Sequence, residues 1–290
     1  MPTDPKTAGP QPPQPAQHQT PPGSDAELTP HADHGETSYR GSDRLRGKVA
    51  LVTGGDSGIG RAVAIAFARE GADVLVSYLD EEEDAAETRR LVEEAGRRCV
   101  TVAGDLVDEA HCEALVRRCV DELGGLDVLV NNAAFQTTHD ELTAFTTEEF
   151  DRAFKTNVYA TFWLCRAAVP HLKPGASIIN TTSVQAYSPD AMLAPYAATK
   201  AAIRNLTQSL AKGLAAKGVR VNAVAPGPVW TPLIPATMPE DAVKTFGQDT
   251  PLGRAAQPRE LAPIYVLLAS DEGSYITGMV YGATGGDPTA

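Results

Sequence analysis

Apolar and polar residues follow two alternating patterns along most of the chain. Short apolar runs rich in β-branched residues predict buried strands, and the longer segments between them carry apolar residues at helical spacing. Several of these segments end in glycine, a frequent helix stop. The predicted strands span residues 48–54, 73–79, 99–106, 126–134, 175–183, 219–227 and 279–282. The predicted helices span residues 57–72, 81–96, 108–125, 146–172, 194–218 and 258–269.

The strands in this alternation are apolar on both faces, as in a parallel sheet that helices cover on each side. The sequence therefore predicts an α/β fold: a single Rossmann-type doubly wound parallel sheet of about seven strands with helices on both faces. Such sheets bind ligands at the carboxyl ends of their strands, so functional residues are expected directly after the strands.

The N-terminal residues 1–46 differ in composition from the rest of the chain. Nine of the 22 prolines lie within the first 30 residues, with few apolar residues among them. This composition predicts a disordered or extended arm before a folded domain at 47–290. Two alternatives stay open: a leader without fixed contacts, or an arm that lies on a neighbouring subunit, where Tyr39 and Leu45 could be buried.

Net charge and cysteine usage narrow the class of protein. The formal net charge is -12, so neither nucleic acid nor an anionic membrane surface is an expected partner. The chain has no apolar run of membrane-spanning length, and its N-terminus lacks the apolar core of a signal peptide. Cys99, Cys112, Cys119 and Cys165 form no CxxC pair and predict reduced core residues. We expect a cytoplasmic protein without a metal site.

A glycine-rich loop, Thr53 to Gly60, joins the first predicted strand to the first predicted helix. Gly54, Gly58 and Gly60 would allow a sharp turn, close approach of the backbone to a pyrophosphate, and tight packing of helix on strand. The helix N-terminus adds free N–H groups and the positive end of a dipole. Because the loop is the first turn of a repeated β/α pattern, it predicts a dinucleotide site.

Further motifs follow in order along the chain. They are Asn-Asn-Ala-Ala at 131–134, Asn157 in a long helix, Ser183 at a strand end, Tyr196 with Lys200, and Pro-Gly at 226–227. With the Gly-x-x-x-Gly-x-Gly spacing of the loop, this order resembles the short-chain dehydrogenase/reductase family over residues 46–286. The proline-rich arm and the segment from Tyr39 to Ala62 are similar to a bacterial general-stress or glucose-dehydrogenase-like subgroup.

The resemblance implies an NAD(P)-dependent oxidoreductase that interconverts an alcohol and a carbonyl, with Asn157, Ser183, Tyr196 and Lys200 as its catalytic residues. Tyr196 and Lys200 are four residues apart and share one helix face. Because a nearby ammonium favours the phenolate, we expect a lowered pKa for Tyr196, which would exchange a proton with the substrate. By resemblance, Ser183 bonds the substrate oxygen, Lys200 bonds the nicotinamide ribose, and Asn157 supports a water that connects Lys200 to solvent.

The resemblance also implies contacts to the cofactor. Asp105 would touch the adenine ring, Asn131 would hold a backbone position beside the cofactor, and Val229 and Thr231 would bind the carboxamide. The expected cofactor residues are Gly54, Asp56, Ser57, Gly58, Ile59, Gly60, Tyr78, Asp105, Leu106, Asn132, Ala133, Tyr196, Lys200, Pro226, Gly227, Val229 and Thr231. Ala134 stands where the family has glycine, and the ending at 282–286 departs from Asn-Gly-Gly; neither change removes a catalytic group.

The end of the second strand bears on the choice of cofactor. An acid there selects NAD, whereas a basic residue suits NADP. Tyr78 takes the usual place of the acid, and no Arg or Lys stands at 57, 78 or 79. The acids at 80–83 would repel a 2′-phosphate, although they also suit the start of a solvated helix. The sequence favours NAD and leaves NADP open.

Substrate and assembly are less well specified. Residues 231–257 have the length and turn residues of a substrate lid. Gln185, Tyr187, Met192 and Leu233 are candidates for the walls of the substrate pocket, although each also suits packing. Because the family pairs the helices at 147–169 and 196–217 across subunits, we expect a homotetramer or homodimer that acts on a small molecule.

Two rival functions stay open. A catalytically silent dinucleotide-binding regulator would lack a catalytic group, and all four are present. A 3-oxoacyl-carrier reductase would need a basic surface for an acidic carrier protein, which the net charge of -12 opposes.

Overall fold

The structure, a computed structural model, describes residues 4–289. Within them, seven strands form one parallel sheet in the order β3-β2-β1-β4-β5-β6-β7. The strands are β1 (Val49–Thr53), β2 (Asp73–Tyr78), β3 (Cys99–Ala103), β4 (Val128–Asn131), β5 (Ser177–Thr181), β6 (Arg220–Pro226) and β7 (Val280–Ala283). The order changes direction between β1 and β4, the point at which such sheets bind ligands. The predicted doubly wound sheet is confirmed.

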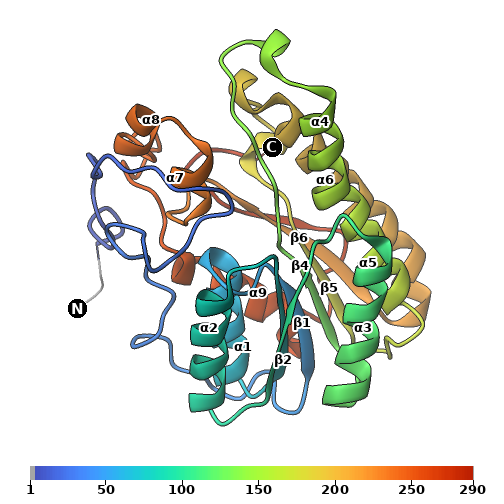
Figure 1. The fold of residues 1–290 in the computed structure, drawn as a ribbon. Coiled ribbons are helices and arrows are strands. Elements are labelled where there is room, and N and C mark those ends of the chain that lie inside the picture. The colour runs from blue at the N-terminus through green and yellow to red at the C-terminus, as the bar shows by residue number, and fades with distance from the viewer. Residues whose placement is uncertain (1–3, 290) are drawn as a thin grey trace.

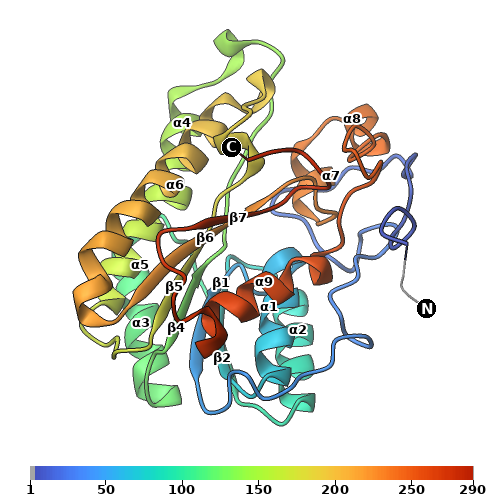
Figure 2. The ribbon, with the colours of Figure 1, turned by 180° about the vertical axis from the view of Figure 1, so that it is seen from behind.

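Helices cover both faces of the sheet (Figures 1 and 2). One face carries α1 (Gly58–Arg69), α2 (Glu82–Glu94) and α9 (Ala262–Ala269), and the other carries α3 (Glu109–Leu123), α5 (Ala160–Ala168) and α6 (Ala194–Leu214). Successive strand residues supply the two apolar cores: Val52 and Val76 pack with α1, whereas Leu51 and Leu75 pack with α3. Among residues 4–289, no helix combines the length and apolar character needed to cross a membrane.

The single helix predicted at 146–172 is divided in the structure. α4 (Thr147–Phe154) starts at a capping box made by Thr146 and Glu149 and passes through a π-helical turn, Lys155–Tyr159, into α5. The turn carries Asn157, whose side chain bonds to the backbone of Phe135. Turns of this kind inside α-helices occur frequently at functional sites.

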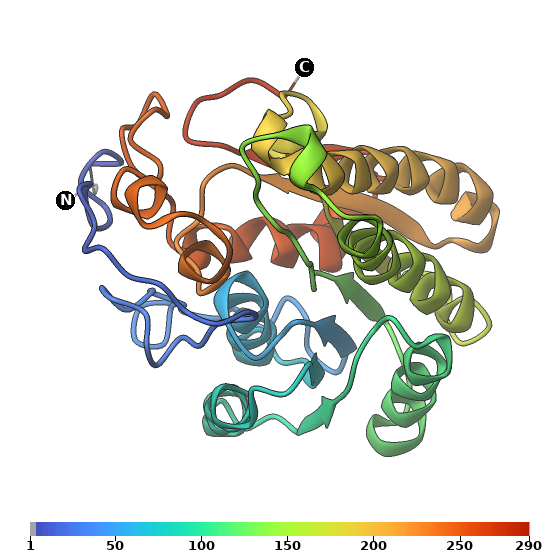
Figure 3. The ribbon, with the colours of Figure 1, turned by 45° about the horizontal axis from the view of Figure 1, so that its top comes forward.

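The predicted lid contains two short helices, α7 (Leu233–Thr237) and α8 (Glu240–Lys244). Seen from above, they stand beside the N-terminal segment (Figure 3). The described chain also has 3₁₀ turns at Leu142–Ala144, Val184–Ala186, Ala191–Leu193, Ala215–Lys217, Pro258–Glu260 and Asp271–Gly273.

The N-terminal arm lies on its own chain. Residues 4–46 contain no helix or strand and run extended past α8, α7 and the start of α1 (Figures 1 and 2). Leu28 and Leu45 are fully buried, and the Tyr39 hydroxyl donates to Glu70 at 2.7 Å. In this structure the arm has both apolar and charged partners on its own domain. Residues 1–3 lie outside the described residues.

Candidate active site

A pocket of about 320 Å³ lies at the carboxyl ends of the strands, where the doubly wound sheet predicts a ligand site. The loops that follow β1 to β6 supply most of its wall, with further residues from α4, the π-helical turn, α6, the lid and the arm. Of the expected cofactor and catalytic residues, the pocket is lined by Gly54, Asp56, Ser57, Gly58, Ile59, Tyr78, Asp105, Leu106, Asn132, Ala133, Ser183, Tyr196, Lys200, Pro226, Gly227, Val229 and Thr231. Gly60 and Asn157 support this wall from behind, through the contacts described below.

The glycine loop has the tight geometry expected of it. Gly54 and Gly58 have positive φ angles of 58° and 48°, which favour glycine. A Cβ on Gly60 would lie 1.8 Å from the carbonyl oxygen of Gly54, so only glycine fits there. The N–H groups of Ile59 and Gly60 have no acceptor within residues 4–289, which leaves them free for an anion.

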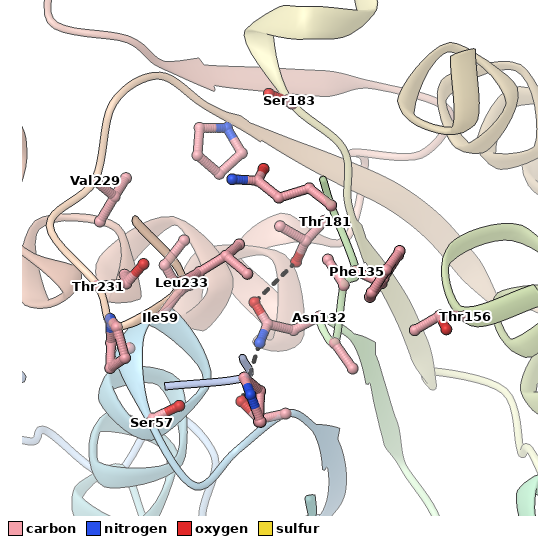
Figure 4. A pocket seen from close by; sticks show the side chains of 18 of the residues that line it. Ser57, Ile59, Asn132, Phe135, Thr156, Thr181, Ser183, Val229, Thr231 and Leu233 are labelled. Atoms are coloured by element: carbon pink, nitrogen blue, oxygen red, sulfur yellow. Dashed lines mark hydrogen bonds between the residues drawn. The ribbon is translucent and has the colours of Figure 1, made fainter. Parts of the chain in front are cut away.

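Asn132 ties the glycine loop to the rest of the pocket (Figure 4). Its Nδ2 donates to the carbonyls of Thr53 and Gly54, both at 3.1 Å, and its Oδ1 accepts from Thr181 at 3.4 Å. The side chain of Asn131 turns away from the pocket and donates to Asn180 at 2.9 Å. Asn132 is therefore the residue of the motif that faces the pocket.

Acidic groups and a tyrosine line the pocket near the end of β2. The Tyr78 hydroxyl donates to Glu82 at 2.7 Å, and burial together with this contact raises the pKa of Tyr78 to about 12. Burial and the nearby Glu81 raise the pKa of Asp56 to about 7. No cationic side chain lines this part of the pocket among the described residues. Asp105, farther along the wall, forms an ion pair with Arg152 at 3.0 Å.

Ser183, Tyr196 and Lys200 all line one pocket, as their motif predicts. Ser183 follows β5, and the other two lie one turn apart on α6. Lys200 is fully buried; its Nζ donates to the carbonyl of Thr181 at 2.9 Å and lies 5.2 Å from the centre of the Tyr196 ring. The arrangement places a hydroxyl, a phenol and an amine where a substrate oxygen could meet them.

The pKa values of this cluster reverse one sequence expectation. Burial raises the pKa of Tyr196 to about 12, and its contact with Ser183 offsets only part of that rise. Burial also lowers the pKa of Lys200 to about 7. The direction found for Tyr196 is the opposite of the lowered pKa predicted for it, because burial disfavours the charged phenolate.

Asn157 is joined to the same helix through a residue that the motifs did not identify. Its Nδ2 donates to Thr199 Oγ1 at 3.0 Å and to the carbonyl of Phe135 at 2.9 Å, while its Oδ1 accepts from the Phe135 N–H at 2.7 Å. Thr199 in turn donates to the carbonyl of Tyr196 at 2.6 Å. Asn157 thus connects the loop after β4 with the helix that carries Tyr196.

The substrate-pocket candidates divide into two groups. Gln185 and Leu233 line the pocket, but Tyr187 and Met192 do not. Tyr187 lies instead beside Arg204, whose guanidinium carbon is 4.6 Å from the centre of the ring. Sequence reasoning missed Pro22, Phe135, Gln136, Arg152, Thr156, Val184 and Leu193, which also line the pocket. Some of them flank motif residues, as Thr156 flanks Asn157 and Val184 flanks Ser183, but no sequence pattern shows which neighbours face the pocket.

The fold and the pocket together define a class of protein. A doubly wound sheet presents free helix N–H groups to the pocket, acids and a tyrosine follow β2, and Ser183, Tyr196 and Lys200 stand in the same wall. The free N–H groups suit a pyrophosphate, and the hydroxyl, phenol and amine suit proton exchange with a substrate oxygen. These features are those of a dinucleotide-dependent oxidoreductase.

Comparison with known proteins gives the family. Residues 54–286 match the family model described as "Enoyl-(Acyl carrier protein) reductase". The chain is 53% identical over 286 residues to "Uncharacterized oxidoreductase YhdF" of Bacillus subtilis, with 98% of each chain covered. It is 52% identical over 274 residues to "General stress protein 39" of the same organism, with 94% of this chain and 96% of that protein covered.

A solved structure gives the same result. A short-chain dehydrogenase from Burkholderia cenocepacia, crystallised in complex with NADP, is 34% identical and has a TM-score of 0.79, with 84% of this chain and 98% of that chain covered. The chain belongs to the short-chain dehydrogenase/reductase family. It is an NAD(P)-dependent oxidoreductase that acts on CH–OH groups and the corresponding carbonyls.

Proposed function

We propose that Tyr196 is the acid/base of this oxidoreductase and that Ser183 and Lys200 act beside it. The observation that carries the proposal is that these three side chains line the wall of one pocket with the glycine loop. The bound nicotinamide would supply the hydride acceptor or donor. Ser183 would donate a hydrogen bond to the substrate oxygen and hold it at the Tyr196 hydroxyl.

The proton and hydride steps balance in both directions. In alcohol oxidation the Tyr196 phenolate would take the hydroxyl proton, while a bound nicotinamide would accept the hydride from the carbon. In carbonyl reduction, Tyr196 returns that proton to the oxygen. The ammonium of Lys200 would stabilise the phenolate, so a protonated Lys200 is the form that supports oxidation.

The decisive experiment compares Tyr196→Phe with Tyr187→Phe, a tyrosine that lies outside the pocket. Turnover should fall by roughly 100-fold or more in Tyr196→Phe, the usual size of general acid–base catalysis, and stay near the wild-type value in Tyr187→Phe. Affinity for the reduced cofactor, followed by its fluorescence, should be unchanged in both variants. Full turnover in Tyr196→Phe would refute the assignment.

We also propose that NAD is the preferred cofactor. Support comes from the acids Asp56 and Glu81, which line the pocket beside Tyr78 and in their ionised forms would repel a 2′-phosphate. The Burkholderia cenocepacia relative crystallised in complex with NADP points the other way, at 34% identity. Steady-state kinetics with each cofactor decides between them: kcat/KM should be higher with NAD, and a higher value with NADP would overturn the proposal.

A paired variant tests the charge argument directly. Glu81→Gln removes an acid from the pocket wall, and Glu83→Gln removes an exposed acid two residues away. If repulsion sets the preference, Glu81→Gln alone should raise kcat/KM for NADP, by several-fold for a partly exposed charge. An equal response of both variants would assign the preference to another part of the pocket.

Substrate, assembly and compartment complete the proposal. A panel of sugars, aldehydes and secondary alcohols, followed at the absorbance of the reduced nicotinamide, would define the small-molecule substrate.

The homotetramer or homodimer is supported by the exposed Phe150, Tyr159 and Phe162 on α4, the π-helical turn and α5, and is tested by light scattering. A cytoplasmic location is supported by four buried cysteines without a disulfide.

A further inference from the structure

The N-terminal arm bonds directly to the two lid helices. The backbone N–H of Gln14 donates to the carbonyl of Lys244 in α8 at 2.8 Å, and that of Gln19 donates to the carbonyl of Pro235 in α7 at 3.0 Å. In Figures 1 and 3 this part of the arm follows the outer side of both helices. This part of the arm therefore backs the lid.

Two arm residues, Leu28 and Ala32, complete the apolar core of the lid, and Leu28 is the larger. Leu28 is fully buried in a small cluster with Trp230, Ile234, Val243 and Ala255. The indole Nε1 of Trp230 donates to the carbonyl of Pro30 at 2.8 Å, just beyond Leu28. This cluster is separate from the two large cores of the sheet, so the lid depends on the arm for much of its burial.

The same arm segment reaches the glycine loop, Thr53 to Gly60. Asp25 Oδ2 accepts from the N–H of Gly58, the first residue of α1, at 3.1 Å and lies 3.2 Å from Arg61 Nη1. The backbone N–H of Asp25 donates to Asp84 in α2 at 2.9 Å. Ser57, the N-cap residue, makes no capping bond with its side chain, so Asp25 takes that role from a distant part of the chain.

Between these two anchors the arm forms part of the pocket wall. Pro22 lines the pocket. A Cβ on the next residue, Gly23, would lie 2.7 Å from the carbonyl oxygen of Pro232, and its φ of 88° also favours glycine. Pro232 stands between Thr231 and Leu233, which line the same pocket. The arm thus approaches the lid as closely as its backbone permits.

We propose that residues 14–30 of the arm are a clasp that holds the lid against the glycine loop, with Leu28 as its anchor. The inference rests on the proposed function, since the pocket that the clasp closes is the cofactor site. The clasp positions the wall of the pocket and takes no part in proton or hydride transfer. Because opening of a lid commonly limits release of a bound molecule, the clasp should slow the dissociation of the cofactor.

Two matched leucines distinguish a clasp from general stabilisation. Leu28 and Leu45 are both fully buried arm residues, but Leu45 packs in the main core with α1 rather than on the lid. Leu28→Ala should raise the dissociation rate and Kd of reduced cofactor by roughly tenfold, as expected when a docked element loses a buried side chain. Leu45→Ala should lower the melting temperature and leave both constants within about twofold. Leu28→Met, which keeps the volume, should behave as wild type.

The measurement uses the full chain and both reduced cofactors, with dissociation followed by stopped-flow fluorescence. Equal effects of Leu28→Ala and Leu45→Ala, or none in Leu28→Ala, would overturn the clasp. If the wild-type chain itself binds neither NADH nor NADPH, it is the proposed function that fails.

Hydrogen exchange on the wild-type chain gives a test that needs no variant. Coupling between two sites is reciprocal. If the docked clasp stabilises the bound cofactor, the bound cofactor must stabilise the docked clasp by the same free energy. Addition of reduced cofactor should slow the exchange of the Gln14 and Gln19 amides, which donate to the lid. The amide of Leu45, which donates to Glu70 away from the lid, should exchange at an unchanged rate. Unchanged exchange at Gln14 and Gln19 on a saturated protein would refute the proposal.

Discussion

The side chain of Asn157 bonds to Thr199, with the amide Nδ2 of Asn157 donating to Thr199 Oγ1 at 3.0 Å. Thr199 Oγ1 also donates to the carbonyl of Tyr196, one turn earlier on α6. Both Asn157 and Thr199 are buried. Thr199 is therefore a positioning residue through which the π-helical turn sets the orientation of the helix that carries the proposed acid/base.

Thr199→Val should slow turnover without weakening cofactor binding. The isosteric change removes the hydroxyl and leaves a buried amide N–H of Asn157 without its acceptor, at a cost of about 1–3 kcal/mol. If half of that cost is expressed at Tyr196, kcat falls by roughly two- to tenfold. Thr199→Ser keeps the hydroxyl and should restore the wild-type kcat. A loss of thermal stability in Thr199→Val with unchanged kcat would limit the residue to a structural role.

Gly60→Ala should abolish cofactor binding. The added methyl group would lie 1.8 Å from the carbonyl oxygen of Gly54, so the loop would have to move and its N–H groups would lose their direction. Gly125→Ala is the matched control, because a Cβ there meets no atom within 4 Å and Gly125 has no positive φ. Calorimetric titration with the cofactor checks both variants. Tight binding by Gly60→Ala would show that the loop tolerates another backbone path.

Lys200→Met should stabilise the cofactor-free protein while removing activity. Burial lowers the pKa of Lys200 to about 7, well below its value of ~10.4 in an unfolded chain. The unfolded chain thus binds the Lys200 proton more tightly than the folded chain does. The resulting loss of folding stability has its full size below pH 7 and disappears as the pH rises to about 10. The melting temperature of Lys200→Met should exceed that of wild type by about 2–5 °C at pH 7, with a smaller difference at pH 10. Lys212→Met, an exposed lysine of the same helix, should show neither effect.

The strands, the two helix layers and most of the pocket could be predicted from the sequence. Apolar runs mark the strands, and residues directly after parallel strands must meet at one edge of the sheet. Gly54, Asn132 and Ser183 follow three different strands and meet for this reason. Tyr196 and Lys200 are predictable as a pair because four residues make one helical turn.

Features that depend on distant contacts were not predictable. The cap on α1 comes from Asp25, 33 residues before Gly58, and no local pattern signals it. The direction of the pKa shift of Tyr196 depends on how deeply the fold buries it, which spacing on a helix does not reveal. Proline content predicts an arm without helices or strands, but the position of the arm depends on single buried residues such as Leu28.

His34 should make the stability of the protein fall as the pH rises above neutrality. His34 is buried in the arm, 3.0 Å from Asp25 and 2.8 Å from Glu36, with Arg61 also facing Asp25. Desolvation and the charge of Arg61 both disfavour the imidazolium. The carboxylates of Asp25 and Glu36 outweigh these two effects and raise the pKa of His34 to about 9. A raised pKa contributes stability that is complete below about pH 6.5 and is lost as the pH passes 9.

The difference in melting temperature between wild type and His34→Gln isolates this contribution. At pH 6 the variant should melt lower, because Asp25 and Glu36 then lose the imidazolium between them and only Asp25 keeps a cationic partner, Arg61. The gap in melting temperature should narrow steadily up to pH 9.5. His18→Gln, an exposed histidine of the same arm, controls for the general effect of the substitution and should track wild type. A gap that stays constant between pH 6 and 9.5 would mean that His34 is neutral in the folded protein, and that Asp25 is balanced by Arg61 alone.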